Sequence, residues 1–164
     1  MTKKTKIVIN MKHIKLFEQF IDEDISLTTD NKYLDLKGEI EEIERVSQDL
    51  SRNKGIDISV KTIVEAFKKA TEEKISDAIW TKLENTESNQ IKTGQWDLVY
   101  KVANSYNKSN PEKLKAKFES GEYKRPMILE LNGIYTLVAG NTRLCTAAAM
   151  GIKPLVFIAK LTTK

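Results

Sequence analysis

An Asn-Gly pair at positions 132 and 133 is the feature that most constrains how this chain can fold. It separates two runs rich in β-forming residues, 127–131 and 134–138. Both central residues of a two-residue hairpin turn need positive φ, which Asn and Gly adopt most readily, so this pair between two such runs is the strongest short-range signal for a hairpin. We predict two antiparallel strands joined by a type I′ turn.

A helix and a further strand are predicted to follow the hairpin. The chain turns at Gly140, becomes helical one or two residues later, and stays so to Met150, with Gly151 placed as the C-terminal cap. Residues 155–159 form another apolar, β-rich run. Three short strands alone leave an unprotected sheet edge, so at least one more strand must come from elsewhere, and residues 6–10 are the candidate.

The preceding part of the chain is predicted to be mostly helical. Apolar residues recur at helical spacing in several stretches between Met11 and Ala103, and Pro111 marks the start of a short helix that ends near Gly121. We therefore expect an α+β fold. Residues 1–120 form the helical region, with 6–10 as a candidate edge strand, and residues 121–164 form a small C-terminal unit of mixed sheet and helix.

Composition excludes several classes of protein. With 40% hydrophobic and 30% charged residues the chain is ordinary globular protein, and no apolar run is long enough to span a membrane. No secretory signal pattern is present at the N-terminus, so we expect a cytoplasmic location. One cysteine excludes an internal disulfide and, with a single histidine, argues against a zinc cluster, whereas a metal site built from carboxylates stays open. The net charge of +4 favours a polyanionic partner, and the oligomeric state is not fixed by any pattern.

The run Gly140-Asn141-Thr142-Arg143 is the candidate ligand site. It lies where a strand passes into a helix, which leaves backbone N–H groups without partners and adds the positive end of the helix dipole. Gly140 lets a ligand approach the backbone, and Arg143 offers a planar fork suited to phosphate. The plain alternative is a capped helix with a glycine turn and an exposed arginine. The run is not a Walker loop, because the second glycine and the Lys-Ser/Thr pair are missing.

Two further features border this run in the sequence. A basic stretch precedes it and either attracts phosphates or is a solvated helix face; its members are Lys113, Lys115, Lys117, Lys124 and Arg125. Among them Arg125 is the best candidate ligand, because it borders the first predicted strand. Glu130 lies on that strand and is a candidate base or metal ligand, although an exposed hairpin carboxylate is the simpler interpretation.

The C-terminal forty residues resemble the ParB/sulfiredoxin superfamily. The resemblance rests on residues 135–144, with Gly140-Asn-Thr-Arg143 at their end, on the alanine-rich helix that follows, and on the last strand. Residues 125–128 are similar to the preceding strand of the family. The Gly-Asn-Thr-Arg version is similar to that of small phage-type proteins, which implies the cytoplasm of a host cell as a location.

The resemblance implies a role in ligand binding for some of these residues and argues against catalytic roles for others. In ParB the corresponding motif is Gly-Glu-Arg-Arg and contacts the phosphates of a nucleoside triphosphate, so Gly140 and Arg143 match. Asn141 stands where ParB has its glutamate, which argues against hydrolysis. Asn141 also stands where sulfiredoxin has its reactive cysteine, which argues against sulfinic acid reduction. Cys145 is interpreted as a small buried side chain.

Three functions are therefore expected to compete. The first is binding of a nucleotide, ATP or CTP with magnesium, with or without weak nucleotidase activity, at Gly140 to Arg143 together with Arg125. The second is a DNA-binding or nuclease-like role, in which Arg143 and the basic stretch hold the nucleic acid backbone. The third is a catalytically inactive interaction module of phage type. Fold analogy does not choose among them.

Overall fold

The computed structural model describes residues 25–106 and 110–163. The candidate strand at 6–10 and the helix expected after Met11 lie outside the described residues. The chain forms two compact units. Among the described residues, unit 1 comprises 25–28 and 36–65, and unit 2 comprises 29–35, 66–106 and 110–163.

The regular elements described in unit 1 are helices. Helix α3 (Ile40–Lys54) buries Ile43, Val46 and Leu50 at helical spacing and ends where Gly55 adopts a left-handed conformation. Helix α4 (Val60–Lys68) begins in this unit and is capped by Ser59, whose hydroxyl accepts the N–H of Thr62 at 3.1 Å.

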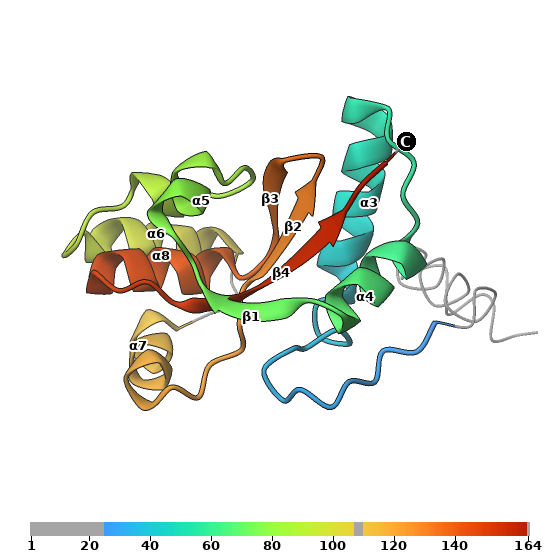
Figure 1. Ribbon diagram of the computed structural model, residues 1–164. Helices are drawn as coiled ribbons and strands as arrows, with labels where there is room; N and C mark the ends of the chain where they lie inside the picture. The colour runs from blue at the N-terminus through green and yellow to red at the C-terminus, as the bar shows by residue number, and fades with distance from the viewer. Residues whose placement is uncertain (1–24, 107–109, 164) are drawn as a thin grey trace, which may run out of the picture. The chain divides into compact units, whose positions relative to one another are not determined.

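Unit 2 contains a four-stranded mixed sheet, which completes an α+β fold (Figure 1). Its order is β1-β4-β2-β3, with β4 and β2 parallel and the other two pairs antiparallel. The elements of the unit are β1 (Thr71–Lys74), α5 (Asp77–Lys82), the 3-10 turn η2 (Ser88–Gln90), α6 (Trp96–Tyr106), α7 (Pro111–Ser120), β2 (Met127–Leu131), β3 (Ile134–Ala139), α8 (Asn141–Met150) and β4 (Leu155–Leu161).

The predicted hairpin is confirmed. Strands β2 and β3 pair antiparallel, with Leu131 opposite Ile134 across the turn. Asn132 and Gly133 have φ values of 52° and 85°, the positive values that a type I′ turn requires. The pairing shifts register between Met127 and Ile128, so the start of β2 is irregular beside the end of β3.

The additional strand does come from outside the C-terminal unit, and it is β1. This strand of four residues, Thr-Glu-Glu-Lys, pairs antiparallel with β4. Its polar sequence has little strand propensity, and the sequence analysis placed no strand there. An edge strand carrying charges is nevertheless a usual arrangement, because charge discourages pairing with another chain. Long-range pairing with β4, rather than local propensity, determines this element.

Helix α8 lies at the centre of unit 2. It contacts α6, α7 and η2, and α6 and α8 run beside one another in Figure 1. Leu144 is fully buried in one cluster with Ile128 and Ile158 of the sheet. Ala147 packs with Phe118 and Tyr123 in another. Small alanine side chains let these neighbours approach α8 closely, so the position of the helix is strongly fixed.

Candidate functional site

Gly140 fixes the sharp turn between β3 and α8. Its φ is 104°, which L side chains rarely adopt. A Cβ at this position would lie 2.9 Å from both Cα and Cβ of Pro126. Glycine is therefore required here for two reasons. It adopts the positive φ, and it leaves room for Pro126, the residue that precedes β2.

The first turn of α8 has no side-chain cap. Gly140 itself occupies the N-cap position, and the first helical hydrogen bond runs from Leu144 N to Gly140 O at 2.9 Å. The N–H groups of Asn141 and Thr142 precede that bond, so the helix supplies them with no partner. The Thr142 side chain is buried and the Asn141 and Arg143 side chains are half-buried. The backbone of this turn, rather than the buried threonine side chain, is therefore the candidate binding group.

Asn141 joins α8 to the segment that precedes η2. Its Oδ1 accepts the hydroxyl of Thr86 at 2.6 Å, and its Nδ2 donates to the carboxylate of Glu87 at 2.6 Å. Glu87 is exposed. The structure therefore brings the carboxylate of Glu87 to the N-terminus of α8. It does so through Asn141, the position at which this chain lacks the glutamate of the ParB motif. An acidic group is electrostatically favoured at the positive end of a helix.

Arg143 is anchored to the segment that enters β2. Its Nη1 donates to the carbonyl oxygen of Lys124 at 2.9 Å. A half-buried arginine in the first turn of a helix opposes the dipole, so this contact offsets an unfavourable position. The guanidinium is thereby held at the segment that enters β2.

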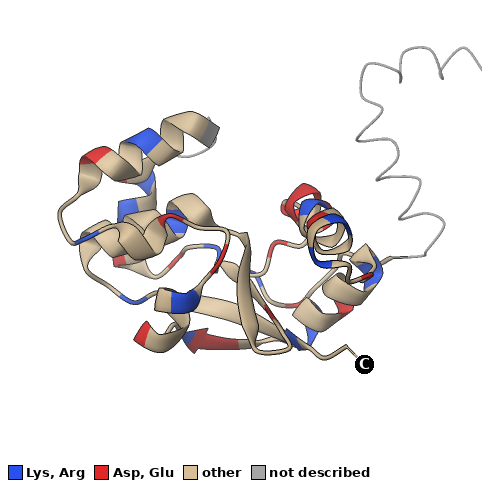
Figure 2. Cartoon of the chain, turned by 90° about the horizontal axis from the view of Figure 1, so that it is seen from above, with Lys and Arg blue, Asp and Glu red and all other residues tan. Residues whose placement is uncertain are grey.

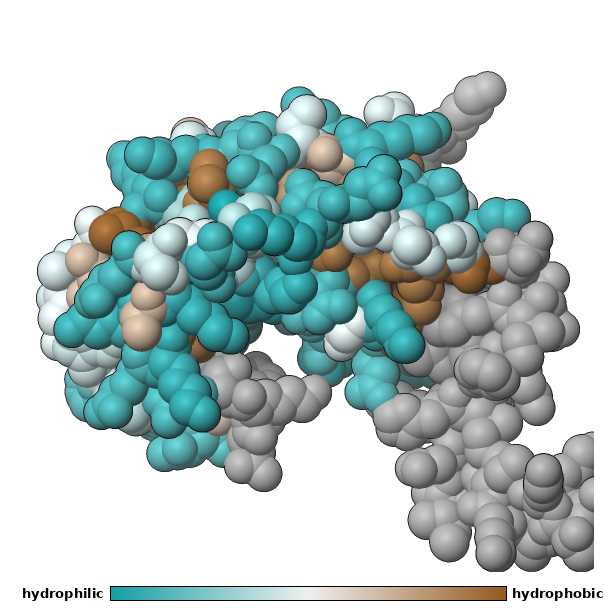
Figure 3. Space-filling model, turned by 90° about the horizontal axis from the view of Figure 1, so that it is seen from below, coloured by the Kyte–Doolittle hydropathy of each residue, from teal (hydrophilic) through white to brown (hydrophobic). Residues whose placement is uncertain are grey.

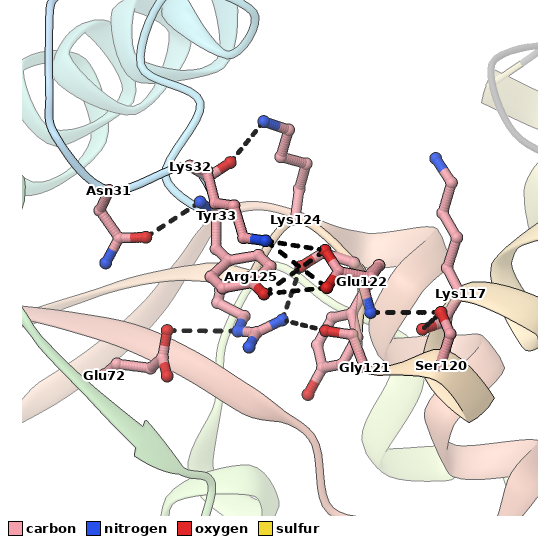
Figure 4. A network of polar contacts seen from close by, with 11 residues as sticks. Asn31, Lys32, Tyr33, Glu72, Lys117, Ser120, Gly121, Glu122, Lys124 and Arg125 are labelled. Atoms are coloured by element: carbon pink, nitrogen blue, oxygen red, sulfur yellow. Dashed lines mark hydrogen bonds and ion pairs between the residues drawn. The ribbon is translucent and has the colours of Figure 1, made fainter.

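Arg125 does not lie on a phosphate-facing rim. It is 5% exposed, and its guanidinium stacks on two tyrosine rings, with its carbon 3.7 Å from the centre of Tyr33 and 4.3 Å from that of Tyr123. Its Nη1 donates to the carbonyl oxygens of Gly121 and Tyr123, and its Nε donates to Glu72 of β1 at 3.3 Å (Figure 4). These contacts engage the guanidinium inside the protein, as stacking and charge-assisted hydrogen bonds commonly do.

The same network holds residues 31–33 against the segment 121–125. Arg125 N donates to Tyr33 O at 2.9 Å, and Lys124 Nζ donates to Lys32 O at 2.6 Å. Lys32 also forms an ion pair with Glu122 (Figure 4). Side-chain hydrogen bonding to Tyr33, and then to Glu122 together with its charge, raises the pKa of Lys32. Sequence analysis missed this docking, because the partners are distant in the chain and carry no motif.

Glu130 lies away from the α8 N-terminus. It pairs with Tyr135 across the hairpin, three positions along β2 from Met127, which itself pairs with Ala139 next to Gly140. That spacing corresponds to about 10 Å. Burial chiefly, and then the charge of Glu130, raise the pKa of Tyr135, and Lys160 lies 3.9 Å from the Glu130 carboxylate. The structure therefore does not bring Glu130 together with residues 140–143.

Cys145 is a buried core residue, as interpreted from the sequence. It has no exposed surface and packs with Val99 and Ala149. Burial, with a smaller contribution from the charge of Glu87, raises the pKa of its thiol to about 12. A neutral, inaccessible thiol is a poor nucleophile.

Charge is mixed over the described chain. Figure 2 shows basic and acidic residues interspersed, with the acidic pair of β1 in red, and Figure 3 shows hydrophilic side chains over most of the face it presents. No group of three metal-ligating side chains occurs within residues 25–106 and 110–163. Across the same residues, no helix has the length and apolar character needed to cross a membrane.

Gly140 and Arg143 belong to the run that the sequence singles out, whereas no sequence pattern points to Thr86 and Glu87. These two residues lie in a polar stretch with no recognisable spacing, 55 and 54 residues before Asn141. Only the fold makes them neighbours. The chain matches no protein family model, no curated protein and no solved structure.

Proposed function

We propose that the N-terminus of α8 binds the phosphate group of a nucleotide, with ATP and CTP as the first candidates. The observation that carries the proposal is the uncapped first turn of α8, which starts at an obligatory glycine and contains Arg143. Backbone N–H groups at a helix N-terminus and an arginine fork together suit a phosphate. The resemblance of residues 125–164 to ParB/sulfiredoxin-like proteins supports the same assignment.

The ligand set differs from the one expected from the sequence. The main-chain N–H groups of Asn141 and Thr142 and the side chain of Arg143 remain candidates. Arg125 acts instead through the backbone of the segment 121–125, which also holds Arg143 through Lys124 O. Arg125 is thus proposed as a positioning residue for the site.

Glu87 bears on whether the ligand carries magnesium. Magnesium is commonly held in proteins by one or two carboxylates together with the phosphates of the substrate. A single exposed carboxylate bonded to Asn141 fits a magnesium ion that arrives with the nucleotide. Without the cation, the same carboxylate repels the phosphate. We therefore propose that the ligand binds as its magnesium complex.

The experiment is a calorimetric titration of the full chain with ATP, CTP and GTP, each with and without magnesium. Arg143→Ala is expected to weaken binding by about 10- to 150-fold, the equivalent of a lost charge-assisted contact. Arg52→Ala is the matched control, because Arg52 is an exposed arginine of α3. Unchanged affinity of Arg143→Ala for every nucleotide that binds would overturn the proposal.

Catalysis is tested in the same samples by measuring release of inorganic phosphate. We expect weak or no turnover, since Asn141 replaces the carboxylate of the ParB-like motif. Turnover that is lost in Glu87→Gln or in Glu130→Gln would instead assign a nucleotidase and identify its carboxylate.

DNA is the second candidate, and one observation favours it. Lys113, Lys115 and Lys117 are all exposed on α7. Binding to duplex DNA would weaken steeply with salt, and the slope would fall when these lysines are replaced together by alanine. Duplex binding of that kind without nucleotide binding would favour DNA over the nucleotide.

A further inference from the structure

A hollow of about 400 Å³ lies between α5, η2 and the C-terminal end of α8. It is separate from the candidate phosphate site, which is at the opposite end of α8. Its volume is within the range of pockets that hold small molecules. No motif in the sequence points to it.

The walls of the hollow are held in place by hydrogen bonds. The indole Nε1 of Trp80 donates to Ser88 Oγ at 2.8 Å, and Asn89 Nδ2 donates to Leu83 O at 3.0 Å. Gly94 N donates to Ala149 O at 2.8 Å and so attaches the 91–95 loop to α8. A preformed site of this kind loses little conformational freedom when a ligand binds.

Three carbonyl oxygens near the end of α8 are already hydrogen-bonded. The carbonyl oxygens of Ala147 and Ala148 accept the N–H groups of Ile152 and Gly151, and that of Ala149 accepts Gly94 N. These are the groups that give a helix C-terminus its partial negative charge. Because they are already bonded, the side chains around the hollow determine which charge it prefers.

The lining of the hollow mixes apolar and polar side chains and carries an excess of positive charge. Trp80, Ile91 and Ile152 line the hollow, together with Lys92 and others. Its acidic residue, Asp77, is paired with Lys153 at 2.9 Å. The ammonium group of Lys92 has no ion pair or hydrogen bond within the described part of the chain, so Lys92 supplies the unbalanced charge.

We infer that this hollow binds a small aromatic carboxylate, with the ring against Trp80 and the isoleucines and the carboxylate at Lys92. A lining with an aromatic and aliphatic part and one unbalanced cation suits a molecule that is apolar at one end and anionic at the other. A neutral aromatic molecule of the same shape gains the apolar contact but not the charge. A free phosphate gains the charge but not the apolar contact.

NMR titration tests the inference on the full chain. The probe is 1-naphthaleneacetate, and its neutral counterpart is 1-naphthaleneacetamide. The chain has two tryptophans, of which Trp80 lines the hollow and Trp96 does not. We expect a saturable shift of the Trp80 indole signal at millimolar acid, no matching shift of Trp96, and amide binding weaker by about two- to five-fold.

Two variants locate the binding. Lys92→Ala should remove the preference for the acid, while Lys101→Ala, at an exposed position on α6, should keep it. Ala148→Leu places a larger side chain in the lining and should abolish both shifts, whereas Ala116→Leu at an exposed position of α7 should not. The inference is overturned if Trp80 does not shift, if acid and amide bind equally to the wild type, or if Lys92→Ala keeps the preference.

Discussion

The guanidinium carbon of Arg125 lies 3.7 Å from the centre of the Tyr33 ring, so a segment far earlier in the chain covers the arginine that precedes the first hairpin strand. The same guanidinium donates to Glu72 and to two backbone carbonyls. One buried side chain thus connects residues 29–35, β1 and the entry to β2. Its function is to hold these segments together.

Arg125→Ala is therefore expected to destabilise the protein by about 2–3 kcal/mol, from lost charge-assisted hydrogen bonds and lost stacking. The Glu72 left behind is about one-third exposed, at 31%, so its charge stays hydrated and the loss remains below that of a fully buried pair. Denaturant unfolding measures the change. Arg52→Ala, the exposed control, should change stability by less than about 0.5 kcal/mol. Equal effects of the two substitutions would contradict the assigned role.

Gly140 and Gly133 provide a matched pair of glycine substitutions. Both have positive φ, but a Cβ at Gly140 meets Pro126 at 2.9 Å while a Cβ at Gly133 meets nothing within 4 Å. Gly133→Ala should cost about 1–2 kcal/mol for conformation alone. Gly140→Ala should cost about 2–4 kcal/mol, because overpacking adds to that cost. If the two substitutions lowered the free energy of unfolding equally, Pro126 would be able to move away from the added Cβ without a measurable loss of stability.

Because the Cys145 thiol is buried, we expect the folded protein to lose stability at alkaline pH. Its thiol pKa is raised to about 12 in the folded protein, whereas the unfolded thiol ionises near its ordinary pKa of about 8.5. Above that lower value the unfolded state loses a proton that the folded state keeps. The contribution of the protonated Cys145 thiol to the free energy of unfolding is therefore fully present below the unfolded pKa. It declines as pH rises towards 12.

The measurement compares unfolding free energies of wild type and Cys145→Ala between neutral pH and pH 10 and above. The variant should show a weaker decline with pH than the wild type. A thiol reagent should also react with wild type only after denaturant is added, because the native thiol is buried. Fast modification of the native protein would refute both expectations.

Much of unit 2 could be predicted from the sequence, because its signals are local. The Asn-Gly turn, the Asn110 cap before Pro111 and the Gly151 cap after α8 each depend on residues a few positions apart. Turns and helix caps are specified by local backbone conformation and nearby hydrogen bonds. They can therefore be predicted from the sequence before the fold is known.

The remaining features depend on contacts between distant residues. Strand β1 exists because it pairs with β4, although its own sequence is polar. Arg125 is buried because Glu72, 53 residues earlier, and the Tyr33 ring meet it in space. Its sequence context, among lysines, favoured an exposed residue. Asn141 was interpreted by what it replaces in a motif, and its partner Glu87 could not be inferred from spacing.

The contact between Asn141 and Glu87 gives the sharpest test of the candidate phosphate site. Glu87→Gln keeps an oxygen that can accept from Asn141 Nδ2 at the observed 2.6 Å contact, but it removes the charge. If the site binds a magnesium nucleotide, the variant should bind magnesium-free ATP more tightly than wild type by about two- to five-fold, since a repulsion between exposed charges is lost. Its affinity should also depend less on magnesium. Glu119→Gln, at an exposed position of α7, is the control and should behave as wild type. Calorimetric titration at fixed ionic strength separates this effect from screening by the added salt. A variant that binds ATP with the wild-type dependence on magnesium would place the phosphate away from Glu87, and the nucleotide would then have to lie at another face of the α8 N-terminus.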